Sequence, residues 1–396
     1  MIKINIYNIS NWDGIKENHI KFIKQIIEDE YKDSNKEPKE ISMNQLPSKV
    51  RRFIKKNIYS IFIGERVSML ASANKLRRMV FKGINDYELE ILDKFYYGNK
   101  QLKEKIINEI QENFLSSEYD FAREKFISNM NKEKIRLYEK DKENFIDNNY
   151  KKYRKGLKIN KILSNLFSYK KLVDGKDGWD RHKLISSINI DVCPYCNRQY
   201  ISTYKENNKR KTTADLDHFY PKSIYPILAL SLYNFIPSCQ LCNSRLKLNK
   251  DFRLEEHIYP YEECFDDYGY YFTTYPNLKG GIDYLRAESN QFDLKIECRN
   301  MDFNSVEKVE NSKKTFKLEE LYSNHKDYAS EIMKKANLYN DDRISIIFDE
   351  FEDLFESREE IIRLIFSNYI NKDDLHRRPL SKLTKDICNE FGIMID

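Results

Sequence analysis

Apolar residues recur at three- and four-residue spacing through residues 14–170, which contain few glycines or prolines. This spacing puts apolar side chains on one side of a helix, so the region is predicted to be mainly helical. The stretch "LPSKVRRFIKKNIYS" is typical of a helix start, with Ser48 as the candidate N-cap. Two glycines in "VDGKDGWD", residues 173–180, interrupt the helical pattern and predict the first domain boundary.

The pattern changes to strands and then back to helices in the last third of the chain. "YGYYFTTYPN" and "QFDLKIECRN" alternate apolar and polar residues, which predicts two short strands around a turn at Gly280–Gly281. From Phe316 onwards the chain is predicted to be helical again. In "DDRISIIFDEFEDLFESREE" nine acids and two arginines surround an apolar helical face, so we favour an amphipathic surface helix over a docking face for a basic partner. That face comprises Ile344, Ile347, Phe348, Phe351, Leu354 and Phe355.

Length and charge narrow the class of protein. At 396 residues the chain exceeds the usual size of a single core, so two or three domains are expected. A hydrophobic content of 40% is enough to build folded cores and is not typical of a disordered chain. The net charge is only +5, so nucleic-acid binding must depend on local clusters. The sequence shows neither a membrane-spanning apolar run nor a signal-peptide pattern, which makes the cytoplasm the expected location and a membrane partner unexpected.

One such cluster lies between Lys49 and Lys82, which contain ten basic residues and a single acid, Glu65. A run of this kind is usually a solvated helix face, and contact with phosphates is the alternative. The candidates for phosphate contact are Arg51, Arg52 and Lys55.

Four of the seven cysteines form two C-x-x-C pairs, "CPYC" and "CQLC". Each such turn can direct two thiolates at one tetrahedral ion, so the two pairs together predict a closed four-cysteine zinc site. Because four thiolates leave no position for water, this zinc is expected to be structural, and unrelated free thiols are the alternative. The predicted ligands are Cys193, Cys196, Cys239 and Cys242.

The loop that this zinc would close contains "ADLDHFYPKS" and "LYNFIPSC", and "CNSRLKLNK" follows directly. "TADLDHF" is predicted to be a strand that ends at His218, "LYNFIPSC" a return strand or turn, and "CNSRLKLNK" the start of a helix. The predicted fold class is therefore α+β: a mainly helical chain with a central zinc-stabilised ββα module and a small β element after it. The predicted domains are residues 1–175, 176–261 and 262–396.

Between residues 190 and 250 several unlike elements follow one another in order: Asp217, His218, Pro221, Asn234, Cys239, Cys242, Asn243 and Lys247. This order resembles the HNH (His-Me finger, ββα-metal) endonucleases that carry zinc-binding cysteine pairs. The departure is Asn243, because many members have a second histidine at that position, although some active members carry asparagine. The resemblance implies a metal-dependent endonuclease that cuts nucleic acid, with double-stranded DNA as the expected substrate.

The chemistry of these residue types suits phosphodiester hydrolysis, which needs an activated water and a counter-charge at phosphorus. His218 is the expected general base, because a neutral imidazole accepts a proton near neutral pH. Asp217 and the amide oxygen of Asn243 are hard donors suited to one Mg²⁺ or Mn²⁺ ion. Asp215 shares the strand face of Asp217 and is a further ligand or a partner of the site.

The family pattern implies that Asn234 orients the histidine through its loop without touching metal. Lys247, four residues after Asn243, is expected to lie one helical turn along the same face and to hold a phosphate. Further candidates for nucleic-acid contact are Lys222, Arg245 and Lys250.

The arrangement resembles the HNH nucleases encoded beside ATPases in bacterial anti-phage systems such as Septu. Two stretches outside this region, "LEELYSNHKDYASEIMKK" and "RPLSKLTKDICNEFG", add to that resemblance. That resemblance implies an ATPase partner and a role in antiviral defence. Two other functions stay open: a toxin-like ribonuclease that uses the same site on RNA, and a non-catalytic zinc module that binds nucleic acid or a protein. Oligomeric state is not predicted.

The tyrosines of "NRQYISTYKENNKRK" alternate with basic residues. Such a stretch can follow a nucleic-acid backbone, and a solvated loop is an equal alternative. The basic residues are Arg198, Lys205, Lys209, Arg210 and Lys211. Outside the motif, surface or packing roles are expected for His19, His182, His257, His325 and His376.

Overall fold

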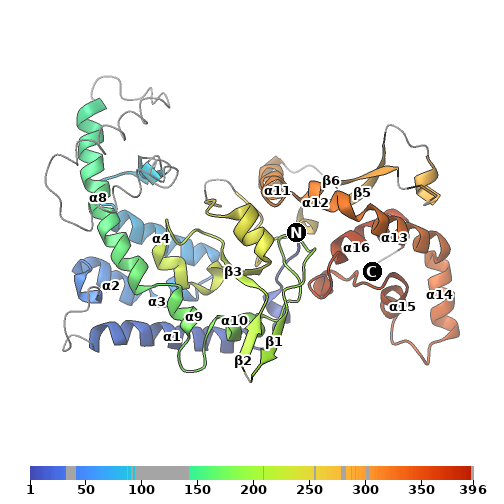
Figure 1. Cartoon of the computed structure of the whole chain (residues 1–396), viewed down its shortest axis with the longest axis horizontal. Helices are drawn as coiled ribbons and strands as arrows, with labels where there is room; N and C mark the ends of the chain where they lie inside the picture. The colour runs from blue at the N-terminus through green and yellow to red at the C-terminus, as the bar shows by residue number, and fades with distance from the viewer. Residues whose placement is uncertain are drawn as a thin grey trace. The chain divides into compact units, whose positions relative to one another are not determined.

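The structure is a computed structural model that combines many helices with small antiparallel sheets (Figure 1). It describes residues 1–32, 42–86, 88–90, 92–93, 142–207, 209–253, 256–277, 282–286, 288–289, 291–299 and 303–393. The chain forms two compact units that interleave along the sequence. Unit 1 comprises Met1–Ile15, Gly178–Phe219 and Phe235–Asp396, and unit 2 comprises Lys16–Asp177 and Tyr220–Asn234. One border between them falls inside the glycine-containing segment at residues 173–180 that predicted a boundary.

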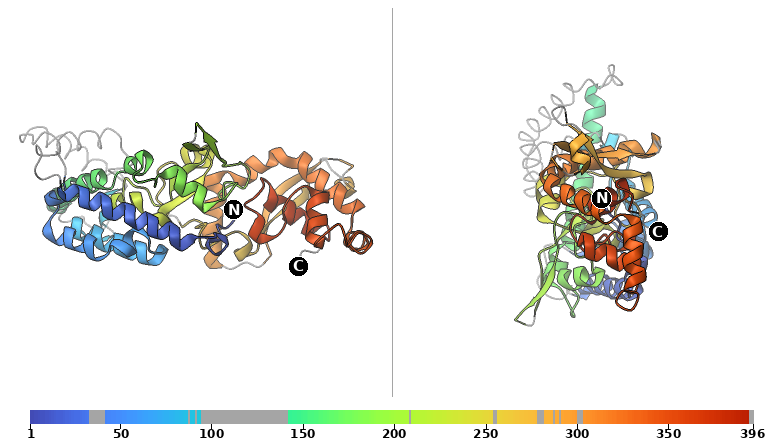
Figure 2. Two further views of the ribbon diagram at one scale, coloured as in Figure 1. Left: turned by 90° about the horizontal axis from the view of Figure 1, so that it is seen from below. Right: turned by 90° about the vertical axis from the view of Figure 1, so that its right-hand side faces the viewer.

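Unit 2 is helical in its described part, as the apolar spacing predicts. Helices α2, α3 and α4 pack together and α8 packs against α4 (Figures 1 and 2). A Cβ atom on Gly156 would clash with the ring of Phe81, so glycine allows α8 to approach this ring closely. The helices of this region are α1 (Trp12–Lys32), α2 (Ser48–Lys56), α3 (Ile58–Phe62), α4 (Arg66–Val80), α8 (Lys142–Leu166) and α9 (Lys170–Asp174), with η3 (Met43–Gln45), η5 (Pro226–Leu230) and η6 (Leu232–Asn234).

The cluster of basic residues between Lys49 and Lys82 is not exposed throughout. Arg77 is buried and forms an ion pair with Asp93, which also accepts a hydrogen bond from the hydroxyl of Tyr153 at 2.8 Å. A second guanidinium N–H of Arg77 donates to the carbonyl of Ile224 at 3.0 Å. One of the ten basic residues therefore stabilises the interior, because its charge is paired and hydrogen-bonded there.

Three two-stranded antiparallel sheets lie in unit 1. β3 pairs with β4 so that Asp217 lies opposite Ile236 and His218 lies opposite Phe235. The two strands predicted after the cysteine region are confirmed as a pair, although the turn predicted at Gly280–Gly281 lies outside the described residues. The strands are β1 (Thr203–Glu206), β2 (Lys209–Thr212), β3 (Asp215–His218), β4 (Phe235–Ser238), β5 (Tyr270–Pro276) and β6 (Phe292–Cys298).

The rest of unit 1 is mainly helical, with α16 packed on β5 and α13 packed on both α16 and β6 (Figure 1). Buried charges also join these parts: the ammonium of Lys382 binds Asp386 on its own helix and Asp266 in η8. The elements are η1 (Ile6–Asn8), α10 (Arg181–Ile188), η7 (Leu241–Lys247), η8 (Asp266–Tyr268), η9 (Ile282–Arg286), α11 (Phe303–Phe316), α12 (Leu318–Tyr322), η10 (Ser323–His325), α13 (Lys326–Leu338), α14 (Asp341–Glu350), α15 (Arg358–Phe366), η11 (Lys372–Asp374) and α16 (Ser381–Glu390).

Two details predicted from the sequence were wrong. Ser48 is the first residue of α2, and its predecessor Pro47 occupies the N-cap position. The single helix expected over residues 341–360 is two helices, because α14 ends at Glu350 and α15 begins at Arg358. Since the helix stops, the predicted apolar face is not continuous, and Leu354 is 70% exposed. Among the described helices, none has the length and apolarity needed to cross a lipid bilayer.

The buried histidine of unit 2, His19, predicts a dependence of stability on pH. Its Nε2 lies 2.7 Å from the carbonyl of Leu230, and burial lowers the pKa of the ring from 6.5 to about 4. At pH 5 the unfolded chain therefore binds a proton that the folded chain does not. We expect His19 to contribute about 2 kcal/mol less to the free energy of unfolding at pH 5 than at pH 7.

Urea unfolding of the unmodified protein and of His19→Gln at both pH values measures this contribution. Gln keeps a hydrogen-bond donor but does not titrate, so the loss of stability between pH 7 and pH 5 should be smaller in the variant. An equal loss in both proteins contradicts the assignment.

Candidate functional site

The four predicted zinc ligands meet at one point inside unit 1. The sulfur atoms of Cys193, Cys196, Cys239 and Cys242 all lie within 4.8 Å of one another, and all four residues are buried. The sulfurs of Cys196 and Cys239 are 3.9 Å apart. Two thiolates bound tetrahedrally to one zinc ion lie about 3.8 Å apart, so the geometry fits. The cluster can hold a structural metal ion such as zinc.

Two tight turns bring the sulfurs together. In the first, the N–H of Asn197 donates to the carbonyl of Cys193 at 2.7 Å, and Asn197 adopts a left-handed conformation with φ of 49°. Asparagine tolerates this conformation better than most residues. The second turn follows the end of β4, where the N–H of Asn243 donates to the carbonyl of Cys239 at 3.1 Å. Each C-x-x-C pair therefore has a backbone hydrogen bond that folds it back.

The electrostatics of the cluster favour a cation. Burial raises the pKa of Cys193 well above its usual range, and hydrogen bonds with the other cluster thiols, Cys193 first, raise that of Cys242. Hydrogen bonds donated by the other three thiols lower the pKa of Cys239. Metal binding drives deprotonation of such thiols, so a divalent ion would oppose the raised pKa values of Cys193 and Cys242.

Asp217 is buried and bound on both of its oxygens. Its Oδ2 accepts a hydrogen bond from the hydroxyl of Tyr195 at 2.6 Å, and its Oδ1 lies 3.1 Å from the ammonium of Lys247. Lys247 has no exposed surface and also donates to the carbonyl of His218 at 2.7 Å. In this arrangement a metal ion at Asp217 would have to displace the ammonium, and a phosphate at Lys247 would have to break the same pair.

The local helix explains why Lys247 does not follow Asn243 along one face. η7 is a π-helix, in which the N–H of Leu248 donates to the carbonyl of Asn243 at 3.0 Å. Hydrogen bonds that reach five residues make a wider turn than those of an α-helix, so four residues do not complete it. Lys247 accordingly contacts Asp217, whereas Asn243 contacts Asp215.

Asp215 is the more accessible carboxylate of β3. Its Oδ2 accepts hydrogen bonds from Nδ2 of Asn243 at 2.9 Å and from the hydroxyl of Ser244 at 3.2 Å. The amide nitrogen of Asn243 is used in this bond, and its oxygen takes no part in it. Carboxylate and amide oxygens are the donor types that Mg²⁺ and Mn²⁺ prefer.

His218 ends β3 and is 8% exposed, with its ring 5.2 Å from that of Phe235 on β4. The loop after it is held by Asn234, which is fully buried. The side-chain oxygen of Asn234 accepts from the N–H of Tyr220 at 2.8 Å, and its nitrogen donates to the carbonyls of Tyr220 and Leu228, each at 3.0 Å. Asn234 thus fixes the backbone of the loop at Tyr220.

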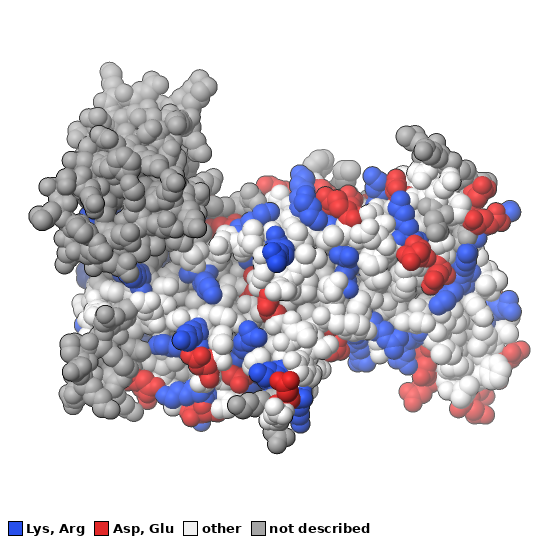
Figure 3. Space-filling model, viewed as in Figure 1, with Lys and Arg blue, Asp and Glu red and all other residues white. Residues whose placement is uncertain are grey.

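The predicted nucleic-acid contacts lie in different surroundings. Lys222 has its ammonium 4.9 Å above the ring of Tyr169, Lys250 donates to Thr315, and Arg51 donates to Asn44. Figure 3 shows Lys and Arg interspersed with Asp and Glu over the described part of one face. Arg52, Lys55 and Arg245 are exposed.

Sequence reasoning missed Tyr195. It lies between the first two cysteines, so the turn that presents two thiols also directs its hydroxyl at Asp217. Its ring stacks on Phe316 at 4.4 Å. Its place inside "CPYC" was the available signal. Among the described residues, the four cysteines are the only group of three or more His, Cys, Asp or Glu side chains placed to hold a metal ion.

The cysteine cluster predicts one zinc ion per chain. We expect Cys242→Ser to lose the metal and to destabilise unit 1, because structural zinc supplies about 10 kcal/mol of apparent folding free energy. Metal content by mass spectrometry and thermal unfolding by circular dichroism measure both effects. Cys298→Ser is the matched control, since Cys298 lies outside the cluster and donates to the carbonyl of Tyr268, which serine can also do. Equal zinc content in the two variants would rule out the site.

The Asp217–Lys247 pair predicts a second effect on stability. Lys247→Met leaves a buried carboxylate without its cation, so the free energy of unfolding should fall by about 3–5 kcal/mol. Adding Asp217→Asn should recover much of the lost free energy of unfolding, because the uncompensated charge is gone. Urea unfolding measures both, with Lys317→Met as the control in an exposed pair with Glu320. A similar loss in the single and double variants argues against a charge-based pair.

Comparison of the whole chain with models of known protein families gave no match, and neither did comparison with curated proteins or with solved structures. The resemblance to HNH endonucleases therefore depends on the motifs in the sequence alone. The geometry adds a four-cysteine cluster and a pair of antiparallel strands that ends at His218, features that metal-binding modules of other function can share.

Proposed function

We propose that the protein is a metal-dependent endonuclease that hydrolyses phosphodiester bonds of nucleic acid, with His218 as the general base. The observation that carries the proposal is the position of His218. His218 ends β3, and the paired strand β4 leads through Cys239 and Cys242 into the short helix η7. Asn234 holds the loop that follows His218. A base held between such anchors keeps its direction when substrate binds, as general-base catalysis needs.

In the proposed reaction His218 takes a proton from the water that attacks phosphorus. The bond from phosphorus to the 3′ oxygen breaks, and that oxygen leaves with a proton from solvent. Asp215 and Asn243 would hold one Mg²⁺ or Mn²⁺ ion, which supplies a counter-charge for the phosphate. Asp217 does not fit that role in this arrangement, since Lys247 and Tyr195 bind both of its oxygens. Instead the contacts of Asp217 with Tyr195 and Lys247 hold β3, the strand that ends at His218, in place. We thus assign the ion to the accessible carboxylate of β3.

A zinc module without catalysis is the second candidate. It is favoured by the buried pair of Asp217 with Lys247, because this pair satisfies the acid beside His218 without a catalytic metal. On this alternative the region binds nucleic acid or a protein, and His218 packs beside Phe235. Duplex DNA as the substrate, a role in anti-phage defence and an ATPase partner are proposals that rest on the resemblance alone.

Cleavage of plasmid DNA with Mg²⁺ or Mn²⁺ tests the proposal. We expect His218→Ala to lower the rate by a factor of about 10²–10⁴, the usual effect of losing a general base. The variant must keep its zinc and its circular dichroism spectrum. His182→Ala is the control, because His182 lies outside the motif. Equal rates in all three proteins would assign the cleavage to a contaminant or another site.

A metal titration in the same assay distinguishes the two carboxylates. Asp215→Asn should raise the Mg²⁺ concentration needed for half-maximal cleavage, whereas Asp217→Asn should act mainly on stability. Repeating the assay with single-stranded RNA of the same sequence separates the ribonuclease from the deoxyribonuclease. If the unmodified protein cuts neither nucleic acid, alone or with cell lysate added, the zinc module is favoured.

A further inference from the structure

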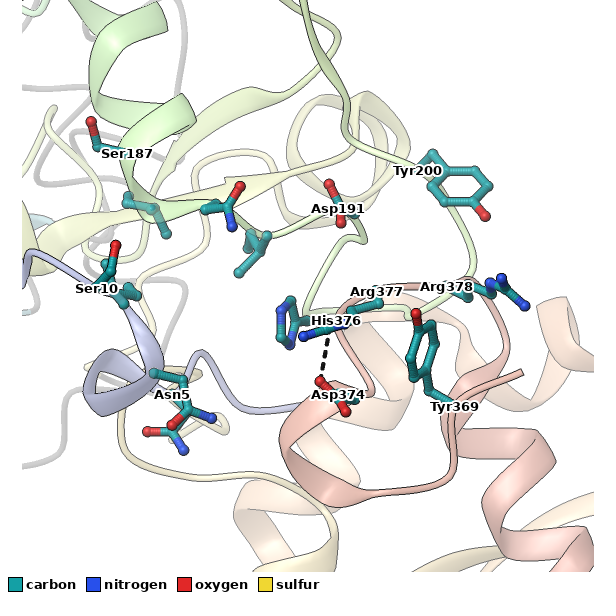
Figure 4. Close-up of a pocket in the computed structure, with 15 residues that line it drawn as sticks. Asn5, Ser10, Ser187, Asp191, Tyr200, Tyr369, Asp374, His376, Arg377 and Arg378 are labelled. Carbon is teal, nitrogen blue, oxygen red and sulfur yellow. Dashed lines mark ion pairs between the residues drawn. The ribbon is translucent and has the colours of Figure 1, made fainter. Parts of the chain in front are cut away.

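Two adjoining cavities in unit 1 form a groove that the proposed catalytic residues do not line. Their volumes are about 740 and 390 Å³, and both are lined by Asn189, Ile190 and Asp191. Sites for small molecules usually have about 300–1,000 Å³, so one or a few nucleotides fit this range. Figure 4 shows the larger cavity, with Tyr200, Tyr369, Arg377 and Arg378 on one side of it.

The C-terminal wall of the groove presents two arginines in fixed positions. The guanidinium groups of Arg377 and Arg378 each lie 5.3 Å from the ring centroid of Tyr369. Arg377 also pairs with Asp374 at 2.8 Å, and Arg378 donates to the carbonyl of Ser367 at 2.8 Å. Because these contacts hold the guanidinium groups before any ligand arrives, less side-chain entropy is lost on binding an anion.

A second wall of the groove presents two tyrosines, Tyr200 just before β1 and Tyr204 within it. Tyr200 lines the larger cavity and Tyr204 lines the smaller one. The two side chains are 56% and 49% exposed, so their rings are available to a ligand. Lys205 and Arg210, which pair across β1 and β2, add cations beside Tyr204.

The walls are joined by the backbone. The N–H of Asp191 donates to the carbonyl of His376 at 3.2 Å, and the N–H of Leu380 donates to the carbonyl of Asn197 at 2.7 Å. Asn197 follows Cys196 directly, so the turn that holds the cysteine cluster also positions the arginine loop.

This combination points to a specific ligand chemistry. The lining residues include four cations, Lys205, Arg210, Arg377 and Arg378, against the carboxylates of Asp191 and Asp374. Surfaces that bind single-stranded nucleic acid typically combine exposed rings, on which bases stack, with arginines that bind phosphates. A duplex hides the faces of its bases, so it cannot use the tyrosines.

We propose that this groove binds a segment of nucleic acid with unpaired bases, which stack on Tyr200 and Tyr204 while Arg377 and Arg378 hold its phosphates. The proposal rests on the proposed function and narrows it, because it replaces the duplex DNA that the resemblance implies with an unpaired segment as the form of the substrate. The two proposals can fail separately. β2 ends at Thr212, three residues before β3 begins at Asp215. The β1–β2 hairpin, which carries Tyr204, therefore leads directly into β3, which carries His218.

Fluorescence anisotropy with a labelled 15-nucleotide oligothymidine tests the groove, with a duplex of equal length for comparison. His218→Ala serves as the parent protein, so that binding is measured without cleavage. We expect Tyr200→Ala and Tyr204→Ala each to weaken single-strand binding about tenfold, the effect of losing one stacked base. Arg378→Ala should weaken binding and lower the slope of affinity against salt by about one.

The matched controls are Tyr275→Ala, an exposed tyrosine on β5, and Arg343→Ala, an exposed arginine beside Tyr339. Neither residue lines the groove, so both variants should bind like the parent. Equal loss in controls and groove variants, or tighter binding of the duplex than of the single strand, overturns the proposal. Competition by thymidine monophosphate at the same concentrations as the oligonucleotide also overturns it, because the site would then hold one free nucleotide.

The two proposals are distinguishable by their outcomes. If the groove residues are needed for oligonucleotide binding but the unmodified protein does not cleave, the nuclease proposal is contradicted and the groove proposal is supported. If cleavage needs His218 but is unchanged in Tyr200→Ala and Arg378→Ala, the nuclease proposal is supported and the groove proposal is contradicted.

Discussion

The convergence of four buried thiols is the constraint on which the rest of unit 1 depends. The turn that carries Cys196 also carries Asn197, whose side chain donates to the carbonyl of Leu375 at 2.9 Å and accepts from the N–H of Lys382 at 2.9 Å. The hydroxyl of Tyr322 donates to the carbonyl of Cys196 at 2.8 Å. One turn therefore connects β3 and β4 to the C-terminal helices, and a metal ion in the cluster would stabilise all of them together.

Buried charge is the second organising feature, and it affects function as well as stability. Lys247 with Asp217, and Lys382 with Asp386, are charges removed from water that depend on close partners. Removing one partner from such a pair is strongly destabilising, although an apolar replacement of the whole pair is often neutral. The pairs therefore define a single arrangement more than they add stability. For Asp217 this arrangement is one in which the acid beside His218 supports the strand.

Much of this could be predicted from the sequence, where local patterns decide. The cysteine spacing predicts the cluster, and the stretches "TADLDHF" and "LYNFIPSC" predict the paired strands, because spacing and residue type are local features of the chain. The π-helical turn after Cys242 could not be predicted, since a one-residue change in hydrogen-bond reach leaves no mark in residue spacing. The contact of Tyr195 with Asp217, like the groove with Arg378, joins distant segments that only the tertiary fold brings together.

The alternation of β3 limits how a nuclease could work here. Asp215 and Asp217 face η7, as their contacts with Asn243 and Lys247 show, whereas His218 faces Phe235 across the strands. Asp215 and His218 are three positions apart in β3, which corresponds to about 10 Å along a strand. Leu216, Asp217 and His218 are at most 8% exposed, whereas Asp215 is half-buried. A substrate would therefore approach β3 from its Asp215 end, which follows the β1–β2 hairpin in the chain.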